Sequence, residues 1–356
     1  MKILILSASI GSGHMQAAEA IAEQLEISCD DVEIVDFMNK KTSNLNWILK
    51  KIYLSILGLI PDLYDRIYRL AGVRRFGSIT RLIWSTLMYL PFSRLLNKFN
   101  PDIIICTHPF PEAAAALWKF LHPNSNKRFT LAAILTDFSL HEIWIYGGVD
   151  LYFVATEEMK TELEQHGNYK VFATGIPIRS QFNAEYRMKN EEFETVLIMG
   201  GGLGLGAFEE TIKNLDNLES RIKIIVVTGN NQSLKAKLES LKSKHELVVL
   251  GFVDNISELM QSADILISKP GGLTLSEAFT AGLPIILLPP IPGPESLNAQ
   301  YAVNQGAALS LSKPSDVAEA IIIFRDQDKL KAMGSASRSL ARPQAARLIA
   351  ELILNY

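Results

Sequence analysis

The stretch KILILSASIGSGHMQAAEAIAEQL (residues 2–25) decides the fold class of this chain. Its first part, Lys2–Ser7, is a short apolar run typical of a buried strand, and Met15–Leu25 carries apolar residues at helical spacing. Glycines at positions 11 and 13 separate the two. A strand, a glycine loop and a helix in this order begin a βαβ unit, and therefore predict a parallel sheet.

The same alternation continues in two series. The first predicts strands at 32–36, 102–107, 130–136, 150–155 and 170–174, and the second at 194–199, 222–228, 247–250, 265–268, 284–288 and 307–310. Gly175–Asn183 contains glycine and proline without a regular period, which suits a linker between the series.

The sequence thus predicts an α/β protein with two doubly wound Rossmann-like domains that face a cleft. The first is expected at 1–178, with a helical insertion at about 44–98, and the second at 185–342. A final helix at 343–356 is expected to pack back on the first domain.

The composition excludes several classes of protein. Of 356 residues, 48% are hydrophobic and 21% charged, as in ordinary globular proteins. A net charge of −3 gives no reason to expect nucleic-acid binding. No apolar run reaches the roughly 18 residues of a spanning helix, and the run after Lys2 is too short for a secretory signal. Cys29 and Cys106 are too few for a disulfide framework, which favours a reducing cytosol.

The first glycine loop, Ser9–His14, lies between the first strand and the first helix. Position 16 is Gln, which excludes the G-x-G-x-x-G dinucleotide fingerprint, and no Gly-Lys-Ser/Thr follows as in a P-loop. The loop does place an imidazole, His14, at the carboxyl edge of the sheet, where it could take a proton from an acceptor hydroxyl near neutral pH. The alternative is a helix-capping or structural histidine.

Two further glycine loops follow strands of the second series. Gly200–Gly206 has five glycines in seven residues, and its backbone N–H groups could wrap a diphosphate. The alternative is a flexible turn. In the second loop, Ser268–Ala278, Gly271 and Gly272 permit close approach of a ligand, and Glu277 could accept the hydroxyls of a ribose. The alternative for Glu277 is a carboxylate that stabilises the helix dipole.

Two more loops offer polar groups. Pro289–Gln300 presents Glu295 and Asn298 to a polyhydroxylated ligand. In Thr136–Trp144, Asp137 could orient His14 or hold an acceptor hydroxyl, and Trp144 could stack on a sugar or an acyl-glycerol. A helix cap and a core residue are the alternatives for these two. The histidines show no metal-ligand spacing.

Taken together, these motifs resemble the GT-B glycosyltransferases that use UDP-sugars, and above all the monogalactosyldiacylglycerol synthases and the bacterial processive diacylglycerol β-glucosyltransferases. The enzyme that adds N-acetylglucosamine to the lipid-linked peptidoglycan precursor is more distantly similar. The resemblance spans nearly the whole chain through GSGH, PDIIICTHP, LTDFSLHEIW, ATGIPIR, IMGGGLG, LGFVDNISELM, ISKPGGLTLSEA and PGPESLNA.

The resemblance implies an inverting transfer of a hexose from a UDP-sugar to diacylglycerol, without a metal and without a permanently bound cofactor. Glucose is favoured over galactose because the motifs are closest to those of the bacterial enzymes. His14 then matches the base, Asp137 lies on the acceptor side, Glu277 meets the ribose and Phe252-Val253 receive uracil. The predicted donor site comprises Gly201, Gly202, Phe252, Val253, Ser268, Gly271, Gly272, Leu273, Thr274, Glu277, Glu295 and Asn298; the predicted acceptor site comprises Gly11, Gly13, His141 and Trp144.

The insertion predicts a contact with the membrane. Seven basic and no acidic residues lie between Arg66 and Lys98, and eight aromatic residues lie between 47 and 92. Such a mixture is typical of an interfacial contact with anionic phospholipid, at the cytoplasmic side of the cell membrane. The alternative is that the apolar positions pack on the first domain. The expected membrane contacts are Arg74, Arg75, Arg81 and Trp84.

Two other functions share parts of this pattern. A UDP-sugar epimerase would have the same two-domain architecture but would need further acid/base carboxylates. A module that only binds its ligand would need no base. The N-acetylglucosaminyltransferase alternative fits the large aromatic insertion less well.

Overall fold

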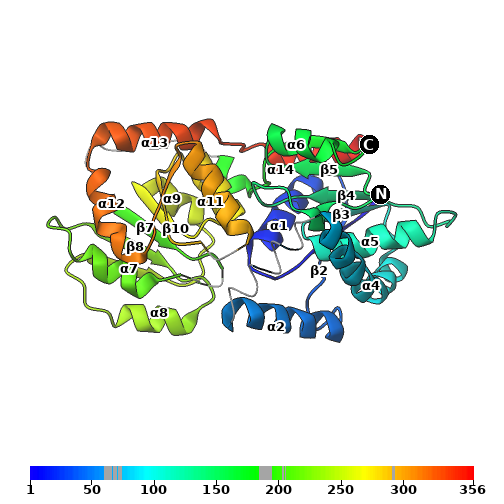
Figure 1. Cartoon of the computed structure of the whole chain (residues 1–356), viewed down its shortest axis with the longest axis horizontal. Coiled ribbons are helices and arrows are strands. Elements are labelled where there is room, and N and C mark those ends of the chain that lie inside the picture. Colours follow the sequence, from blue (N-terminus) through cyan, green and yellow to red (C-terminus); the bar gives the residue numbers. More distant parts are fainter. Residues whose placement is uncertain are drawn as a thin grey trace. The chain divides into compact units, whose positions relative to one another are not determined.

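The computed structural model of the chain forms two compact units (Figure 1). It describes residues 1–59, 66, 70, 74–183, 195–202, 204, 206–290 and 293–356. The first unit contains Met1–Arg179 and Gln344–Tyr356, and the second contains Ser180–Ile291 and Glu295–Pro343. The chain therefore returns to its first unit for its last helix.

The first unit is built on a six-stranded sheet with the order β2-β1-β3-β4-β5-β6, and every pair of neighbours is parallel. The four strands between the edge strands β2 and β6 are apolar and almost wholly buried, as expected where helices cover the two sides of a sheet. The strands are β1 (Lys2–Ser7), β2 (Asp31–Asp36), β3 (Ile103–Cys106), β4 (Thr130–Ile134), β5 (Leu151–Val154) and β6 (Lys170–Ala173). The helices are α1 (Gly13–Leu25), α2 (Asn44–Leu59), α4 (Arg74–Phe99), α5 (Pro109–Leu121), η1 (Glu142–Trp144), α6 (Glu157–Glu164) and α14 (Ala345–Leu354).

The second unit repeats this plan with a parallel sheet of order β12-β11-β10-β7-β8-β9. Its core joins β7, β8 and β10 to one side of α7 and α12. The strands are β7 (Thr195–Met199), β8 (Lys223–Val227), β9 (Glu246–Leu250), β10 (Ile265–Ser268), β11 (Ile285–Leu287) and β12 (Ala308–Ser310). The helices are η2 (Ser180–Asn183), α7 (Phe208–Leu215), α8 (Gln232–Glu239), α9 (Ile256–Ser262), α10 (Gly272–Thr280), α11 (Pro294–Asn304), η3 (Pro314–Asp316), α12 (Val317–Ile323) and α13 (Gln327–Ser339).

The predicted fold class is confirmed: every predicted strand is present, and both sheets are parallel and doubly wound. Strand order also determines which loops are neighbours. Because carboxyl ends of parallel strands meet at one edge, the loops after β1, β3 and β4 are adjacent in the first unit. The loops after β11, β10 and β7 are adjacent in the second. These are the loops that carry most of the predicted site residues.

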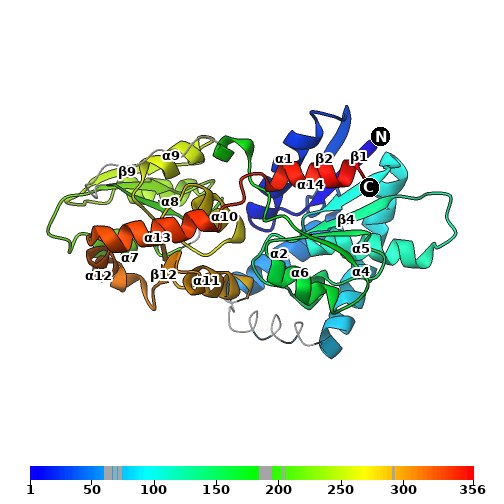
Figure 2. The same ribbon diagram turned by 90° about the horizontal axis from the view of Figure 1, so that it is seen from above.

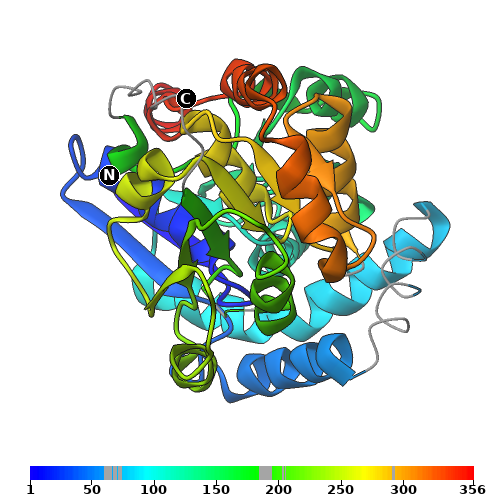
Figure 3. The ribbon, with the colours of Figure 1, turned by 90° about the vertical axis from the view of Figure 1, so that its left-hand side faces the viewer.

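Two helices of the predicted insertion, α2 and α4, belong to the first unit and lie along its lower side in the view of Figure 1; α2 is blue and α4 cyan in Figure 3. Part of the segment between them falls outside the described residues. Among the helices that are described, none combines the length and the apolar character needed to cross a bilayer.

The last helix, α14, completes the core of the first unit. Ile349 and Ile353 are 0% and 1% exposed and join a cluster with Ile3 and Ile21. Figure 2 shows α14, in red, beside α1. A helix from the end of the chain therefore covers the strand and the helix with which the chain begins.

This packing predicts a large effect from one side chain. Replacing Ile349 by Ala removes buried methyl groups and leaves a cavity, and should lower the free energy of unfolding of the first unit by about 2–5 kcal/mol. The neighbouring Leu348 is 41% exposed, and Leu348→Ala should change the free energy of unfolding by less than about 0.5 kcal/mol. Urea unfolding of the two variants measures these changes, and equal changes would show that Ile349 does not contribute to this core.

Candidate active site

The imidazole of His14 is held by two groups from neighbouring strands. Its Nδ1 lies 2.8 Å from the backbone carbonyl oxygen of Thr107, which follows β3, and 2.9 Å from the Thr136 hydroxyl, which follows β4. A carbonyl oxygen can only accept a hydrogen bond, so Nδ1 carries a proton and donates it. In the neutral ring, Nε2 is then left with its lone pair. This is the tautomer that a general base acting through Nε2 requires.

The surroundings also keep this ring neutral. Burial lowers the pKa of His14 below its ordinary value of 6.5. The Asp137 carboxylate and the Thr107 carbonyl act in the opposite direction and raise the pKa, but by less. The net direction is downward, so the ring is an unprotonated base at neutral pH. Asp137 thus acts on the charge of His14, whereas Nδ1 donates to the Thr107 carbonyl and lies within hydrogen-bond distance of the Thr136 hydroxyl.

Asp36, at the end of β2, fixes the glycine loop that leads to His14. Its carboxylate accepts hydrogen bonds from the Ser9 amide (3.1 Å), the Ser9 hydroxyl (2.5 Å) and the Met38 amide (3.0 Å). The Lys50 ammonium, on α2, also donates to the Ser9 hydroxyl. Gly11 has a φ of +85°, a conformation that favours glycine, and a side chain there would meet no atom within 4 Å. Gly13 begins α1.

A series of ring contacts leads from His14 towards the insertion. The His14 and His108 centroids are 4.6 Å apart, those of His108 and Phe110 are 4.7 Å apart, and Phe110 stacks on Trp84 of α4 at 4.2 Å. His108 Nδ1 accepts a hydrogen bond from the Phe110 amide and so caps α5. Burial holds the pKa of His108 well below its usual value, so this ring is neutral. His14 therefore has a series of packed aromatic rings on one side.

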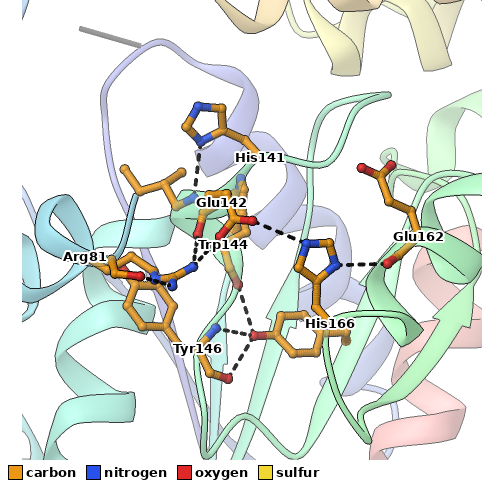
Figure 4. Close-up of polar contacts among 10 residues, drawn as sticks. Arg81, His141, Glu142, Trp144, Tyr146, Glu162 and His166 are labelled. Atoms are coloured by element: carbon orange, nitrogen blue, oxygen red, sulfur yellow. Dashed lines mark hydrogen bonds and ion pairs between the residues drawn. The ribbon is translucent and has the colours of Figure 1, made fainter. Parts of the chain in front are cut away.

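The loop after β4 is tied to α4 by an ion pair (Figure 4). Arg81 Nη1 donates to the Glu142 carboxylate at 2.7 Å and to the Glu142 carbonyl at 2.9 Å. His166 Nε2 lies 3.3 Å from the other Glu142 oxygen. His141 caps η1 through Nδ1, which accepts from the Ile143 amide at 3.2 Å. The loop after β4 is thus anchored on both sides.

These contacts bear on three predictions. Arg81 is only 19% exposed and its charge is balanced by Glu142, so it is not a free cation for a lipid surface. Trp84 stacks on Phe110 and is partly exposed, so its contact with a membrane stays a prediction. The Trp144 residue is 4% exposed, which leaves too little ring surface for stacking on a ligand, and it belongs to the core. The side chains of Arg74 and Arg75 lie outside the described residues.

In the second unit, the glycine loop after β7 packs on the turn after β8. The Asn230 amide donates to the Gly202 carbonyl at 3.0 Å, and the Gly204 amide to the Gly201 carbonyl at the same distance. Gly204 has a φ of +58°, and a Cβ there would lie 2.4 Å from the Thr228 carbonyl oxygen. Only glycine fits this close approach at position 204.

The loop after β10 leads directly into α10. Gly271 is the N-cap, without a side chain to cap the helix, and the first intrahelical bond runs from the Leu275 amide to the Gly271 carbonyl. The amides of Gly272, Leu273 and Thr274 form the first turn, which favours an anion. Further along α10, Glu277 is 4% exposed.

The remaining residues of the predicted donor site differ in exposure. Phe252, two residues after the end of β9, is an aromatic residue that is 51% exposed, and Val253 is partly buried. Asn298, on α11, is fully buried. Glu295, at the start of α11, forms an ion pair with Lys269, which the sequence analysis did not single out. Within the described part of the chain, no group of three or more His, Cys, Asp or Glu is placed to hold a metal ion.

Two family models match the chain. Residues 14–178 match the monogalactosyldiacylglycerol (MGDG) synthase model, and residues 195–349 match the C-terminal domain of glycosyltransferase family 28. Two relatives named processive diacylglycerol beta-glucosyltransferase are similar over their length. That of Bacillus pumilus is 32% identical, with 99% of this chain and 94% of the relative covered, and that of Bacillus cereus is 34% identical, with 99% and 93% covered.

The chain belongs to the family of the processive diacylglycerol beta-glucosyltransferases. Solved structures support its fold. Acinetobacter baumannii MurG is 17% identical with a TM-score of 0.64, and both chains are covered completely. Spinosyn rhamnosyltransferase SpnG, complexed with thymidine diphosphate, is 12% identical with a TM-score of 0.66, with 99% and 100% covered. The GT-B fold class is therefore confirmed.

The electrostatics of the base predict a pH effect. Because the Asp137 carboxylate raises the pKa of His14, Asp137→Asn should lower that pKa further, and the acidic limb of the kcat/KM profile should move to lower pH. On the plateau, kcat should fall about tenfold or more, since the imidazolium formed in the transition state loses a favourable charge.

The matched control is Asp31→Asn, which removes a carboxylate from the start of β2, at the opposite edge of the same sheet. It should leave the profile unchanged. An acidic limb that stays in place or moves upward in Asp137→Asn would contradict the assigned coupling of Asp137 and His14.

Proposed function

We propose that the protein transfers a hexose from a UDP-hexose to 1,2-diacylglycerol with inversion, and so forms a β-glycosyldiacylglycerol. The observation that carries the proposal is the fixed tautomer of His14, with Nδ1 bonded to Thr107, in a chain of this family. The relatives are named as diacylglycerol glucosyltransferases, which supports diacylglycerol as the acceptor and favours glucose as the hexose. The phosphate-binding character of the second unit's glycine loops supports a nucleotide-sugar donor.

The chemistry follows from these groups. His14 Nε2 takes the proton of the acceptor hydroxyl, whose oxygen attacks C1 of the hexose. The bond between C1 and the β-phosphate oxygen breaks, and its electron pair leaves with UDP. Backbone amides at the start of α10 and in the Gly201-Gly202 loop stabilise the charge that develops on the diphosphate. In this proposal Glu277 holds the ribose, Phe252 and Val253 receive the uracil, and no metal takes part.

The test is an incubation of the protein with UDP-glucose or UDP-galactose, with and without diacylglycerol in mixed micelles. We expect UDP release only when acceptor is present, a β-linked glucolipid by mass and linkage analysis, and a lower rate with UDP-galactose. His14→Ala should bind UDP normally but turn over roughly 10²–10⁴ times more slowly.

Other outcomes would contradict the proposal in distinct ways. Interconversion of nucleotide sugars without UDP release would indicate an epimerase. Transfer to a polyprenyl-linked peptidoglycan precursor in place of diacylglycerol would indicate the N-acetylglucosaminyltransferase alternative. Binding without either reaction would indicate a binding module. Near-normal turnover by His14→Ala would show that His14 is not the base.

We also propose that α4 docks the enzyme on anionic phospholipid, because diacylglycerol remains in the bilayer. Ile79, Leu82, Ile83, Leu87 and Leu90 are between 37% and 64% exposed, and their spacing places them on one face of the helix. Exposed Arg94 and Lys98 lie at its end. An apolar face with nearby cations suits a peripheral contact. The reduced cysteines are in keeping with the cytoplasmic side.

The docking face makes a separate prediction. Leu82→Ser with Leu90→Ser removes the two most exposed leucines of α4, and should weaken sedimentation with phosphatidylglycerol-rich vesicles by about tenfold or more, at roughly 1 kcal/mol for each partly inserted leucine. UDP binding should not change, because the donor loops belong to the other unit. High salt should weaken binding of the unaltered protein.

The control is Ile27→Ser with Ile322→Ser, which removes two isoleucines that are 76% and 57% exposed elsewhere on the chain. This variant should sediment like the unaltered protein. If both double variants sediment equally well with the vesicles, α4 is not the docking face.

A further inference from the structure

Lys269 and Glu295 join two loops of the second unit. Lys269 directly follows β10, and Glu295 lies in the first turn of α11, which follows β11. The two strands are parallel neighbours, so both residues come from the same edge of the sheet. The Lys269 ammonium donates to one Glu295 carboxylate oxygen. The side chains are 22% and 15% exposed, so the pair is partly withdrawn from water.

Lys269 belongs to the loop that the proposed function assigns to the diphosphate. The Gly271 amide donates to the Lys269 carbonyl at 2.9 Å, which folds the residue onto the N-cap of α10. The hydroxyl of Ser268, the preceding residue, is buried and has no hydrogen-bond partner among the described residues. The start of α10 thus combines a partial positive charge, an ammonium group and an unsatisfied hydroxyl, all of which suit phosphate oxygens.

Glu295, in contrast, belongs to the loop predicted to meet a polyhydroxylated ligand, which in the proposed function is the hexose, and a hexose needs hydrogen-bond acceptors. A carboxylate committed to an ammonium group is a poorer acceptor for sugar hydroxyls than one that has been released. The ion pair therefore connects the groups proposed for two different parts of the donor.

We propose that Lys269 binds the β-phosphate of the donor and that this contact takes the place of its ion pair with Glu295, whose carboxylate then accepts hydroxyls of the hexose. The inference rests on the proposed function for the class of donor. A diphosphate carries more negative charge than a carboxylate, and Coulomb attraction scales with charge, so the exchange is favourable. When the bond to C1 breaks and its electron pair moves to the β-phosphate oxygen, Lys269 stabilises the charge on the departing UDP.

If the diphosphate replaces Glu295 as the partner of Lys269, substitutions of these two residues should have opposite effects on UDP binding. Lys269→Met should weaken UDP binding about tenfold or more, as for loss of a charge-assisted hydrogen bond, and leave UMP binding unchanged. Lys269→Arg should restore most of the affinity. Glu295→Gln should bind UDP several-fold more tightly, because the competitor for Lys269 is gone. It should nevertheless lose part of the affinity of UDP-glucose relative to UDP.

Isothermal titration calorimetry with UDP, UMP and UDP-glucose measures these changes. The matched control is Lys223→Met, which removes a lysine 3.2 Å from Glu246 at the start of β8, at the opposite edge of the sheet. It should bind all three ligands normally. Thermal unfolding of each variant checks that it is folded.

Two results would overturn the inference. If Glu295→Gln weakens UDP binding as Lys269→Met does, the ion pair only stabilises the two loops. If neither substitution changes the affinity for UDP, Lys269 does not contact the diphosphate. These outcomes leave the proposed transferase intact, since they are obtained with a wild-type protein that binds UDP. A wild-type protein that binds no UDP at all would overturn the donor assignment, and the inference with it.

Discussion

The hydrogen bond from His14 Nδ1 to the Thr107 carbonyl is the constraint on which the proposed activity depends. It fixes the tautomer, and thereby leaves Nε2 as the atom that can take a proton. The acceptor is backbone, so the strand pairing of the fold itself holds it in place. The Thr107 amide donates to the Leu6 carbonyl of β1, and His14 lies in the first turn of α1, the helix that follows β1. His14 is therefore positioned by β1 and β3, two neighbouring strands that also contribute to the core.

Each unit brings its loops to one sheet edge, but the two edges have different chemistry. The edge of the first unit gathers His14, the neutral imidazole of His108 and the Arg81–Glu142 ion pair, which holds the neighbouring loop. The edge of the second gathers glycine loops, the start of α10 and the ammonium of Lys269. Proton transfer and binding of an anionic leaving group are thus assigned to separate units. This division explains why variants of one unit are expected to leave the other's ligand in place.

The sequence predicted the fold well because its signals were local. Short apolar runs alternate with amphipathic helices, and the loops that follow strands must lie at one edge, so His14 and the glycine loops could be found without a structure. The hydrogen-bond and ion-pair partners of the site residues could not be found from the sequence. The Thr107 carbonyl is a backbone group 93 residues from His14, and a backbone contact leaves no residue type to recognise. Arg81 appeared free in a basic segment because its partner, Glu142, lies 61 residues further along the chain.

The tautomer of His14 tests the proposed role of this ring most directly. Nitrogen-15 NMR of protein labelled at histidine, with the His14 signals assigned by their loss in a His14→Ala sample, distinguishes protonated from unprotonated ring nitrogens. At pH 7.5 we expect a protonated Nδ1 and an unprotonated Nε2, and a pKa below 6.5 on titration. A proton on Nε2 with a bare Nδ1, or a ring that is doubly protonated at this pH, would contradict that role.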